Sequence, residues 1–346
     1  MKAVFIPSKN KIEVRDVPEP EPYDDMVVVK IMATTICGTE RGSYETGNQT
    51  GLAGAAGHEA AGIVWKTDKA RRVKTGDHIS VFPTIWEHCG KCPSCLAGHW
   101  VFCSSPKIKR NYQGTHAQYM LVPEDICLSI PDGMPFEVGA MLDDCIGTPY
   151  RAIMRSGVQA GDKVLITGVG PIGAAAVVIA KYLKAVVIAV DTNEYRLNHA
   201  SLLGADFIFN PASDNITEKI INITGGKGVD VAVDCSGVDI AQVQCLDFTR
   251  QGGKVAFVGI KSKNTTINVH DHFIHKELTA IGSWASTPQA HFEIIRLIQH
   301  GMPINKIITH QYGIDDAATA FKVFFNGKAL KVVINPWQTN KGKQTT

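Results

Sequence analysis

The sequence lacks an apolar run long enough to cross a membrane as a helix, and we do not expect its first residues to act as a signal peptide. Its longest apolar run extends from Ala174 to Ala180, far short of the roughly 20 residues that a bilayer requires. The first ten residues, MKAVFIPSKN, have no apolar core of the signal-peptide type. We therefore expect a cytoplasmic protein with no membrane partner.

A strong charge of either sign is also missing. The formal net charge is +2 over 346 residues, which offers no basic surface for the phosphates of a nucleic acid, so we expect no nucleic-acid partner. The length suits two domains with separate cores. Nine cysteines cannot all pair in disulfides, and four of them lie between 89 and 103, a crowding that indicates metal binding in a reducing compartment.

Residues 1–147 predict a mostly β domain. Short β-rich runs are separated by turn sequences such as PEPEPYDD and KTGD. The runs are MKAVFI, KIEVRDV, MVVVKIMA, HISVF and AQYMLV. This pattern is typical of a barrel-like or sandwich fold. We interpret two stretches as inserts, the Gly/Ala-rich residues 51–62 and the Cys-rich residues 89–103.

From residue 148 the pattern changes to apolar runs that alternate with helix-length segments. This alternation predicts an α/β domain with a doubly wound parallel sheet of six strands. The strands are KVLIT, AVVIAV, DFIFN, VDVAVD, KVAFVGI and TAIGSW, and the helices are PIGAAAVVIAKYLK, NEYRLNHASLLG, NITEKIINIT and DIAQVQCLDFTRQ. Residues 287–346 add an amphipathic helix, HFEIIRLIQ, and a strand, KVVINP.

A glycine motif follows the strand KVLIT and opens a helix, the context that a dinucleotide site requires. The first glycine permits a tight turn, the second leaves room for a pyrophosphate, and the third lets helix and strand pack closely. The helix start offers N–H groups to the phosphates. A tight turn without a ligand is the alternative interpretation. The candidate residues are Gly168, Gly170, Pro171, Ile172 and Gly173.

The next strand ends at Asp191, about 20 residues after the glycines, where a carboxylate binds the ribose hydroxyls of NAD. The same carboxylate repels a 2′-phosphate, so the sequence favours NAD over NADP. Arg196, one turn into the following helix, is a candidate for stacking on adenine. A surface ion pair is an equal alternative for that arginine.

Four cysteines have the spacing C-x2-C-x2-C-x7-C within a lobe that we place at 88–104. Four thiolates complete a tetrahedral zinc shell with no open position for a substrate. The loop has no hydrophobic periodicity, so the metal must supply its order. Free thiols, two local disulfides, or a ligand role for His88 or His99 are the alternatives. The predicted ligands are Cys89, Cys92, Cys95 and Cys103.

A second candidate metal site is more dispersed. Cys37 lies in TTICGTE, and His58 and Glu59 lie in GHEAAG. A cysteine and a histidine with a third ligand and one open position make a catalytic zinc site. Spacing alone does not link these residues, because a lone cysteine is usually part of a core.

The order of the motifs resembles the zinc-containing medium-chain alcohol and polyol dehydrogenase superfamily from end to end. The matching motifs are CGTE, GHEAAG, KTGDHISV, the four-cysteine lobe, GTPYRA, GVGPIG, the strand ending at Asp191, and FVGI. The resemblance implies a GroES-like catalytic domain at 1–147, a Rossmann domain at 148–286, and a return to the catalytic domain at 287–346.

The resemblance also implies a catalytic zinc held by Cys37, His58 and a third ligand in MLDDCIGTPYRAI. The family pattern places that ligand at Asp144, with Glu59 next to the metal and able to exchange with water. Asp143 and Cys145 flank this position, so an error of one residue would move the ligand to one of them, and a solvated turn is a further alternative. Adjacent side chains of an extended segment point opposite ways, so we expect only one aspartate to reach the metal.

Further roles follow from the same resemblance. Thr39 takes the proton of the substrate hydroxyl, and Glu40 orients the ligand histidine. Gly42 stands where many relatives have a relay histidine, so the outer proton path must differ. The residues expected at the nicotinamide are Thr148, Val258, Gly259 and Ile260.

The implied activity is hydride transfer between a secondary alcohol or its ketone and NAD, in either direction, with two zinc ions per chain. CGTE and the zinc lobe favour polyols, sugars or amino alcohols, whereas Asp144 favours simple secondary alcohols. A non-enzymatic NAD-binding redox sensor on the same fold is the rival hypothesis. The apolar strand TAIGSW would form an exposed edge, so we expect a homodimer or homotetramer.

Overall fold

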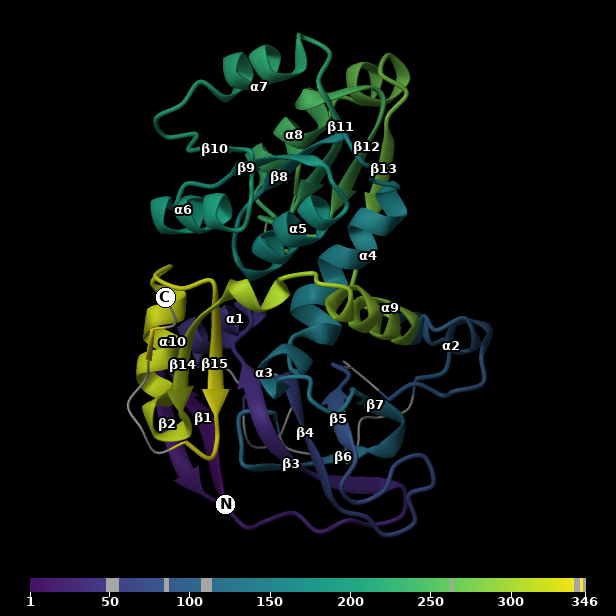
Figure 1. The fold of residues 1–346 in the computed structure, drawn as a ribbon, viewed down its shortest axis with the longest axis vertical. Coiled ribbons are helices and arrows are strands. Elements are labelled where there is room, and N and C mark those ends of the chain that lie inside the picture. Colours follow the sequence, from purple (N-terminus) through teal and green to yellow (C-terminus); the bar gives the residue numbers. More distant parts are fainter. Residues whose placement is uncertain (48–55, 84–86, 107–113, 262–263, 339–342, 345–346) are drawn as a thin grey trace. The chain divides into compact units, whose positions relative to one another are not determined.

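The computed structural model describes residues 1–47, 56–83, 87–106, 114–261, 264–338 and 343–344, and Figure 1 shows its elements. The chain forms two compact units. We call residues 1–147, 287–296 and 308–346 the β unit, and residues 148–286 and 297–307 the α/β unit. Among the described helices, none has the length and apolarity needed to cross a membrane.

The β unit contains a large mixed sheet with the order β16-β14-β15-β3-β4-β5-β7, to which β6 is added by pairing with β3. A separate ribbon joins β1 to β2. The strands are β1 (Lys2–Ser8), β2 (Lys11–Asp16), β3 (Met26–Thr35), β4 (Glu59–Lys66), β5 (His78–Val81), β6 (Tyr119–Pro123), β7 (Cys127–Ser129), β14 (Ile308–Gly313), β15 (Lys331–Asn335) and β16 (Lys343–Gln344). The long apolar strand β3 lies at the centre, because it pairs with β4, β6 and β15.

Short helices connect these strands. They are α1 (Arg41–Thr46), α2 (Pro93–Leu96), α3 (Phe136–Gly139), most of α9 (Pro288–Gln299), α10 (Ala317–Phe325), the π-helix η4 (Leu142–Ile146) and the 3-10 turns η1 (Gly38–Glu40), η2 (Trp100–Phe102), η3 (Glu124–Ile126) and η7 (Ile314–Asp316). The end of α9 and the 3-10 turn η6 (Ile304–Ile307) belong to the α/β unit. Buried side chains of β1, β15 and α10 form one core, and those of β3 to β7 form another.

The prediction of an insert at 51–62 is wrong where the structure describes it. Residues from Glu59 onward form β4, between β3 and β5. A Cβ built on Gly62 would lie 2.1 Å from the Lys30 carbonyl oxygen. The small residues of this stretch therefore belong to closely packed strands and not to an insert. Residues 51–55 of the predicted insert lie outside the described part.

The α/β unit has the predicted doubly wound fold. Its six parallel strands have the order β10-β9-β8-β11-β12-β13, which is the order of two mononucleotide-binding halves. The strands are β8 (Lys163–Thr167), β9 (Val186–Val190), β10 (Phe207–Phe209), β11 (Val229–Asp234), β12 (Thr249–Phe257) and β13 (Thr279–Gly282). The helices are α4 (Gly147–Ser156), α5 (Pro171–Tyr182), α6 (Glu194–Leu202), α7 (Ile216–Thr224), α8 (Asp239–Phe248) and the π-helix η5 (His270–Ile274).

Helices cover both faces of this sheet (Figure 1). Apolar side chains of α7 and α8 form one core with Leu165, Ile188 and Val255 of the strands, whereas α5 lies over the other face (Figure 1). The predicted helix 239–251 is too long, because α8 ends at Phe248 and β12 begins at once.

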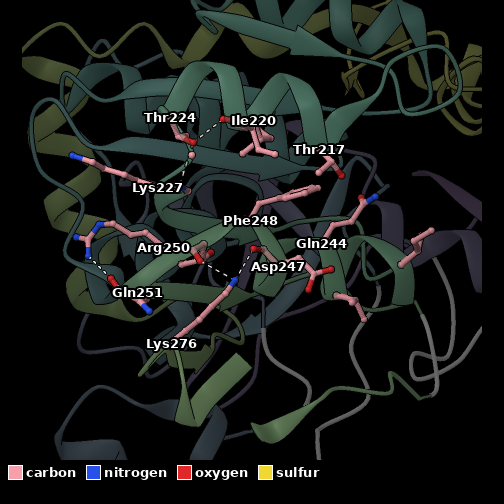
Figure 2. A pocket seen from close by; sticks show the side chains of 16 residues that line it. Thr217, Ile220, Thr224, Lys227, Gln244, Asp247, Phe248, Arg250, Gln251 and Lys276 are labelled. Carbon is pink, nitrogen blue, oxygen red and sulfur yellow. Dashed lines mark hydrogen bonds between the residues drawn. The ribbon is translucent and has the colours of Figure 1, made fainter. Parts of the chain in front are cut away.

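A pocket of about 940 Å³ lies in the α/β unit, between α7, α8 and the starts of β11 and β12 (Figure 2). Its lining includes Gly228 just before β11 and Thr249 at the start of β12. Ligands of doubly wound sheets bind at the carboxyl ends of the strands. This pocket is therefore at the opposite end from a dinucleotide site.

Candidate active site and metal centres

The first candidate site begins where β3 ends. Cys37 follows β3 and precedes η1, which carries Thr39 and Glu40. The Cys37 N–H donates to Glu40 Oε2 over 2.9 Å, and the Thr39 hydroxyl donates to Cys37 Sγ over 3.3 Å. The turn thus fixes the thiol and places a hydroxyl beside it.

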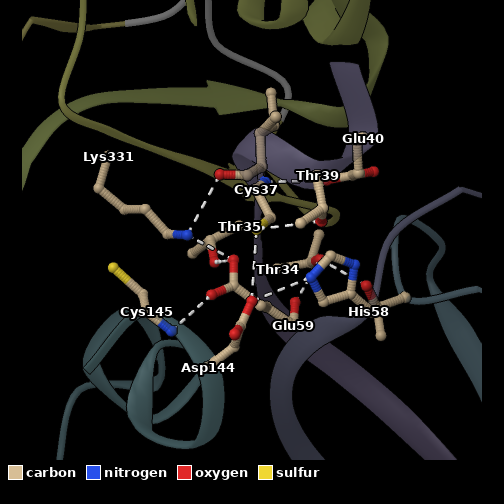
Figure 3. Close-up of polar contacts among 12 residues, drawn as sticks. Thr34, Thr35, Cys37, Thr39, Glu40, His58, Glu59, Asp144, Cys145 and Lys331 are labelled. Atoms are coloured by element: carbon tan, nitrogen blue, oxygen red, sulfur yellow. Dashed lines mark hydrogen bonds and ion pairs between the residues drawn. The ribbon is translucent and has the colours of Figure 1, made fainter. Parts of the chain in front are cut away.

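Side chains from three segments converge on that thiol (Figure 3). The Cys37 thiol donates to Asp144 Oδ2 over 3.3 Å, and His58 Nε2 lies 3.1 Å from the same oxygen. One ligand atom from each of Cys37, His58, Glu59 and Asp144 lies within 4.8 Å of the others. The structure therefore brings together the four residues that the sequence could not link by spacing.

The two neighbouring aspartates point to different partners. Asp143 is buried and accepts from the Ser80 hydroxyl at 2.6 Å and from His291 Nδ1 at 3.0 Å. Asp144 faces Cys37 and His58. The expectation of an extended segment is wrong, because these residues lie in η4, where the Ile146 N–H donates to the Met141 carbonyl oxygen. The π-turn still separates the two carboxylates.

Glu59 lies at the start of β4 and receives donors on both oxygens. The Thr35 hydroxyl donates to Oε2 over 2.7 Å, and the Cys145 N–H donates to Oε1 over 3.0 Å. Lys331 of β15 also forms an ion pair with Oε2 and donates to the Ile36 carbonyl oxygen. These contacts fix the carboxylate beside the convergent group.

Glu40 was expected to orient His58, but both of its carboxylate oxygens accept hydrogen bonds from other groups. Its Oε1 accepts from His116 Nε2 at 3.0 Å, and its Oε2 accepts from the Cys37 N–H. His116 Nδ1 lies 2.9 Å from the Thr34 hydroxyl. Glu40 thus connects the Cys37 turn to a fully buried histidine.

Burial and the interactions among Cys37, His58 and Asp144 shift the pKa values of all three residues. Burial and the charge of Asp144 raise the pKa of the Cys37 thiol. Burial alone would lower the pKa of His58, but Cys37 and Asp144 raise it well above its ordinary value. Burial alone would raise the pKa of Asp144, but His58 holds it well below its usual range. Thiolate, imidazole and carboxylate are ligands that zinc accepts, so the donor set fits this metal.

The four-cysteine lobe forms a second convergent group. The Sγ atoms of Cys92 and Cys95 are 3.4 Å apart, and those of Cys89 and Cys95 are 3.9 Å apart. With Cys103, one sulfur from each lies within 4.8 Å of the others. All nine cysteines are free thiols, so local disulfides are absent and the four sulfurs fit a tetrahedral metal.

Backbone N–H groups favour the thiolate form in this lobe. The N–H groups of Cys95 and Ser104 lower the pKa of Cys92 to about 5, whereas burial raises that of Cys95 to about 12. His88 stacks on Trp100 with ring centroids 4.0 Å apart. The metal-competent group comprises the cysteines without His88 or His99.

The glycine motif of the α/β unit has the geometry of a phosphate-binding turn. Gly168 has φ +81°, which favours glycine, and a Cβ on Gly173 would lie 1.9 Å from the Gly168 carbonyl oxygen. A Cβ on Gly170 would meet nothing within 4 Å, so this glycine borders open space. Pro171 and Ile172 then begin α5, and the turn fits a pyrophosphate.

Asp191 follows β9 beside that turn. Its Oδ2 accepts from the Val169 N–H at 2.7 Å, and its Oδ1 accepts from the Asn193 N–H at 2.9 Å. Arg196 lies 3.6 Å from Asp191 Oδ2. Asp191 therefore ties the glycine turn to the start of α6.

The other predicted cofactor residues lie in the same unit. Thr148 is buried in the first turn of α4. The N–H groups of Val258 and Gly259 both donate to the Asp234 carbonyl oxygen, and the Ile260 side chain is exposed.

Sequence reasoning missed His116 and Lys331. His116 lies in GTHAQY, which carries no motif, and its role became visible only from its contact with Glu40. A lysine followed directly by the apolar residues VVI of KVVIN was a usable signal, since a fully buried lysine requires a partner.

Models of two protein families match the chain. Residues 23–132 match "Alcohol dehydrogenase GroES-like domain", and residues 171–300 match "Zinc-binding dehydrogenase". The L-threonine 3-dehydrogenase of Pyrococcus furiosus is 35% identical over 328 residues, covering 92% of each chain. The chain belongs to the zinc-type medium-chain dehydrogenase/reductase superfamily.

Other members of the superfamily match over nearly the full length. The sorbitol dehydrogenase of Halalkalibacterium halodurans is 30% identical and covers 93% of this chain and 95% of its own. The structure of alcohol dehydrogenase TADH from Thermus sp. ATN1 superposes with a TM-score of 0.88 at 24% identity, covering 97% of this chain and 99% of that one. The similarity to the Thermus structure concerns the fold alone. Membership of the superfamily makes this chain a zinc-type dehydrogenase.

Proposed function

We propose that this dehydrogenase transfers hydride between a secondary alcohol of the polyol, sugar or amino-alcohol class and NAD. The observation that carries the proposal is the convergence of Cys37 Sγ, His58 Nε2 and Asp144 Oδ2, with the Thr39 hydroxyl 3.3 Å from the thiol. The reaction needs a cation site with a proton acceptor next to it, and these residues supply both.

In this proposal Cys37, His58 and Asp144 hold the catalytic zinc. When bound, zinc supplies a Lewis acid that lowers the pKa of a substrate hydroxyl. The Thr39 hydroxyl oxygen accepts the released proton and passes its own proton on through the cofactor ribose, so the threonine stays neutral. Glu59, held by its donors, lies beside the three ligands and is the residue able to replace one of them.

The glycine turn and Asp191 are proposed to hold the dinucleotide. Open space at Gly170 admits the pyrophosphate, and the Asp191 carboxylate accepts from the ribose hydroxyls and disfavours a 2′-phosphate. The nicotinamide, when bound, accepts or donates the hydride. Arg196 is the candidate for the adenine, and Thr148 with residues 258–260 for the nicotinamide.

A second zinc is proposed for Cys89, Cys92, Cys95 and Cys103. Four sulfurs leave no open position, so this ion has a structural role and the enzyme holds two zinc ions per chain. The convergent thiols and the backbone donors that lower the pKa of Cys92 support this assignment.

We further propose that the protein is a homodimer or homotetramer. β13 is an edge strand of the parallel sheet, and an exposed edge is usually covered. Light scattering at micromolar concentration tests this, and a monomer would contradict it.

The substrate class rests on the relatives named above, one a threonine and one a sorbitol dehydrogenase. The test is a screen in which NAD reduction is measured with polyols, sugars, amino alcohols and simple secondary alcohols. Turnover confined to simple secondary alcohols would favour the alternative that Asp144 suggests. Absence of turnover in protein that holds both zinc ions and binds NAD would favour a redox sensor.

A further inference from the structure

The α/β unit carries a third group of potential metal ligands, in and after the π-helix η5. One ligand atom from each of His270, Asp271 and His275 lies within 4.8 Å of the others, and all three side chains are exposed. No role in the proposed reaction uses these residues.

The π-turn itself creates this arrangement. The His275 N–H donates to the His270 carbonyl oxygen over 3.0 Å, a hydrogen bond that spans five residues. In an α-helix, side chains five residues apart point about 140° away from each other. Here the two imidazole rings meet edge to face with centroids 4.0 Å apart. Single π-turns of this kind are frequent at functional sites.

The carboxylate is held between the rings. Asp271 Oδ1 lies 2.9 Å from His270 Nδ1 and 3.7 Å from His275 Nδ1. Its other oxygen accepts from the Asn268 side chain, and the Asp271 N–H donates to Asn268 Oδ1 over 3.2 Å. Asn268 thus orients the carboxylate as outer partners of metal ligands do.

The backbone beneath the group is anchored to α8. The buried His272 lies 2.8 Å from Asp247 Oδ1. The Lys276 ammonium donates to the carbonyl oxygens of Leu246, Asp247 and Thr249 over 2.9, 2.6 and 3.1 Å, at the wall of the pocket in Figure 2. The three exposed ligands therefore stand on a fixed base, which metal binding requires.

We propose that His270, Asp271 and His275 bind a divalent transition-metal ion of borderline softness, such as Zn²⁺, Co²⁺ or Ni²⁺. Two imidazoles and one carboxylate suit these ions, with water in the remaining positions. The site is separate from the two zinc sites proposed above.

The test uses the full-length, zinc-loaded protein dialysed to equilibrium against Co²⁺, with total metal counted by elemental analysis. We expect the unmodified protein to hold one metal ion per chain more than the double variant His270→Ala/His275→Ala. Asn268→Ala should weaken binding of the additional ion about 10-fold. His300→Ala, which removes an exposed histidine outside the group, should retain the additional equivalent.

A second measurement is the melting temperature with and without Co²⁺. An ion that binds the folded state raises it, so the increase should occur in the unmodified protein and in His300→Ala and be lost in the double variant. Circular dichroism and dehydrogenase activity should be unchanged in the double variant. Equal metal counts in the unmodified protein and the double variant, or equal loss in His300→Ala, would overturn the proposal.

Discussion

The carboxylate of Glu59 and the ammonium of Lys331 form an ion pair in which each side chain is about 1% exposed. The pair joins β4 to β15 beside the Cys37 turn. Burial lowers the pKa of Lys331, but its neighbours Cys145 and Glu59 raise it, and the net shift is above the ordinary value. The positive charge of Lys331 offsets the repulsion between the carboxylates of Glu59 and Asp144, which lie in the same group.

Removing the cation should therefore be costly. Lys331→Met leaves Glu59 buried without its partner, and the loss of one member of a buried pair typically destabilises a protein by about 3–5 kcal/mol. Urea unfolding of the zinc-loaded protein measures this change. Lys331→Arg keeps the charge and should cost less, and Lys331→Met/Glu59→Gln should recover part of the loss. A Lys331→Met variant as stable as the unmodified protein would show that the pair does not stabilise the fold.

The parts of the site that are local in sequence could be predicted from it. The glycine turn, its flanking strand and helix, and the four cysteines each occupy a short segment, so spacing carries the information. Lys331 lies 272 residues after Glu59 and His116 lies 76 residues after Glu40. These pairs depend on which strands become neighbours, and no local pattern specifies that.

The role of Glu40 shows a different limit. The family pattern suggested that Glu40 orients His58, but the glutamate accepts a hydrogen bond from the buried His116. Similarly, small residues in β4 suggested an insert because their packing partner, the β3 backbone, is remote in sequence. Tertiary packing decides both cases.

The cofactor preference should change with Asp191. Asp191→Gly removes the charge that repels a 2′-phosphate, so the ratio of kcat/KM for NADP to that for NAD should rise by at least about 10-fold. Because Asp191 also accepts from Val169 and Asn193, the glycine variant should lose some stability. Asp191→Asn is the matched control, because it removes the negative charge but keeps an oxygen that can accept a hydrogen bond from a backbone N–H group. It therefore separates the effect of the charge from the loss of stability. Equal efficiency with both cofactors in the unmodified protein would contradict the assignment.

The cysteine lobe should bind its zinc independently of the other site. Cys103→Ser removes one of the four thiolates, so the zinc content measured by elemental analysis should decrease from two ions per chain towards one. The melting temperature should decrease because the metal orders this loop. Cys127→Ser, at a buried cysteine outside both metal groups, should keep two zinc ions. Active unmodified protein with a single zinc would refute the two-site assignment.

The sharpest comparison is between Asp144 and Asp143. Asp144→Asn weakens the proposed metal ligand beside Cys37 and His58, so kcat should decrease by orders of magnitude while the zinc proposed for the four cysteines stays bound. NAD binding, measured by calorimetry, should survive because the glycine turn and Asp191 belong to the other unit.

Asp143→Asn should have a different effect. This carboxylate contacts Ser80 and His291, and an amide keeps the hydrogen bond from Ser80 but loses the charge facing the histidine. Burial lowers the pKa of His291, but the charge of Asp143 raises it. The net effect is a pKa above the ordinary value. The stabilisation from this pair is thus present below about pH 6.5 and lost as pH rises through the folded-state pKa. We expect Asp143→Asn to retain catalytic zinc and most of kcat while its free energy of unfolding decreases most at low pH.

If Asp143→Asn loses the zinc and Asp144→Asn keeps it, the ligand is Asp143. If both keep activity and zinc, Glu59 becomes the third ligand.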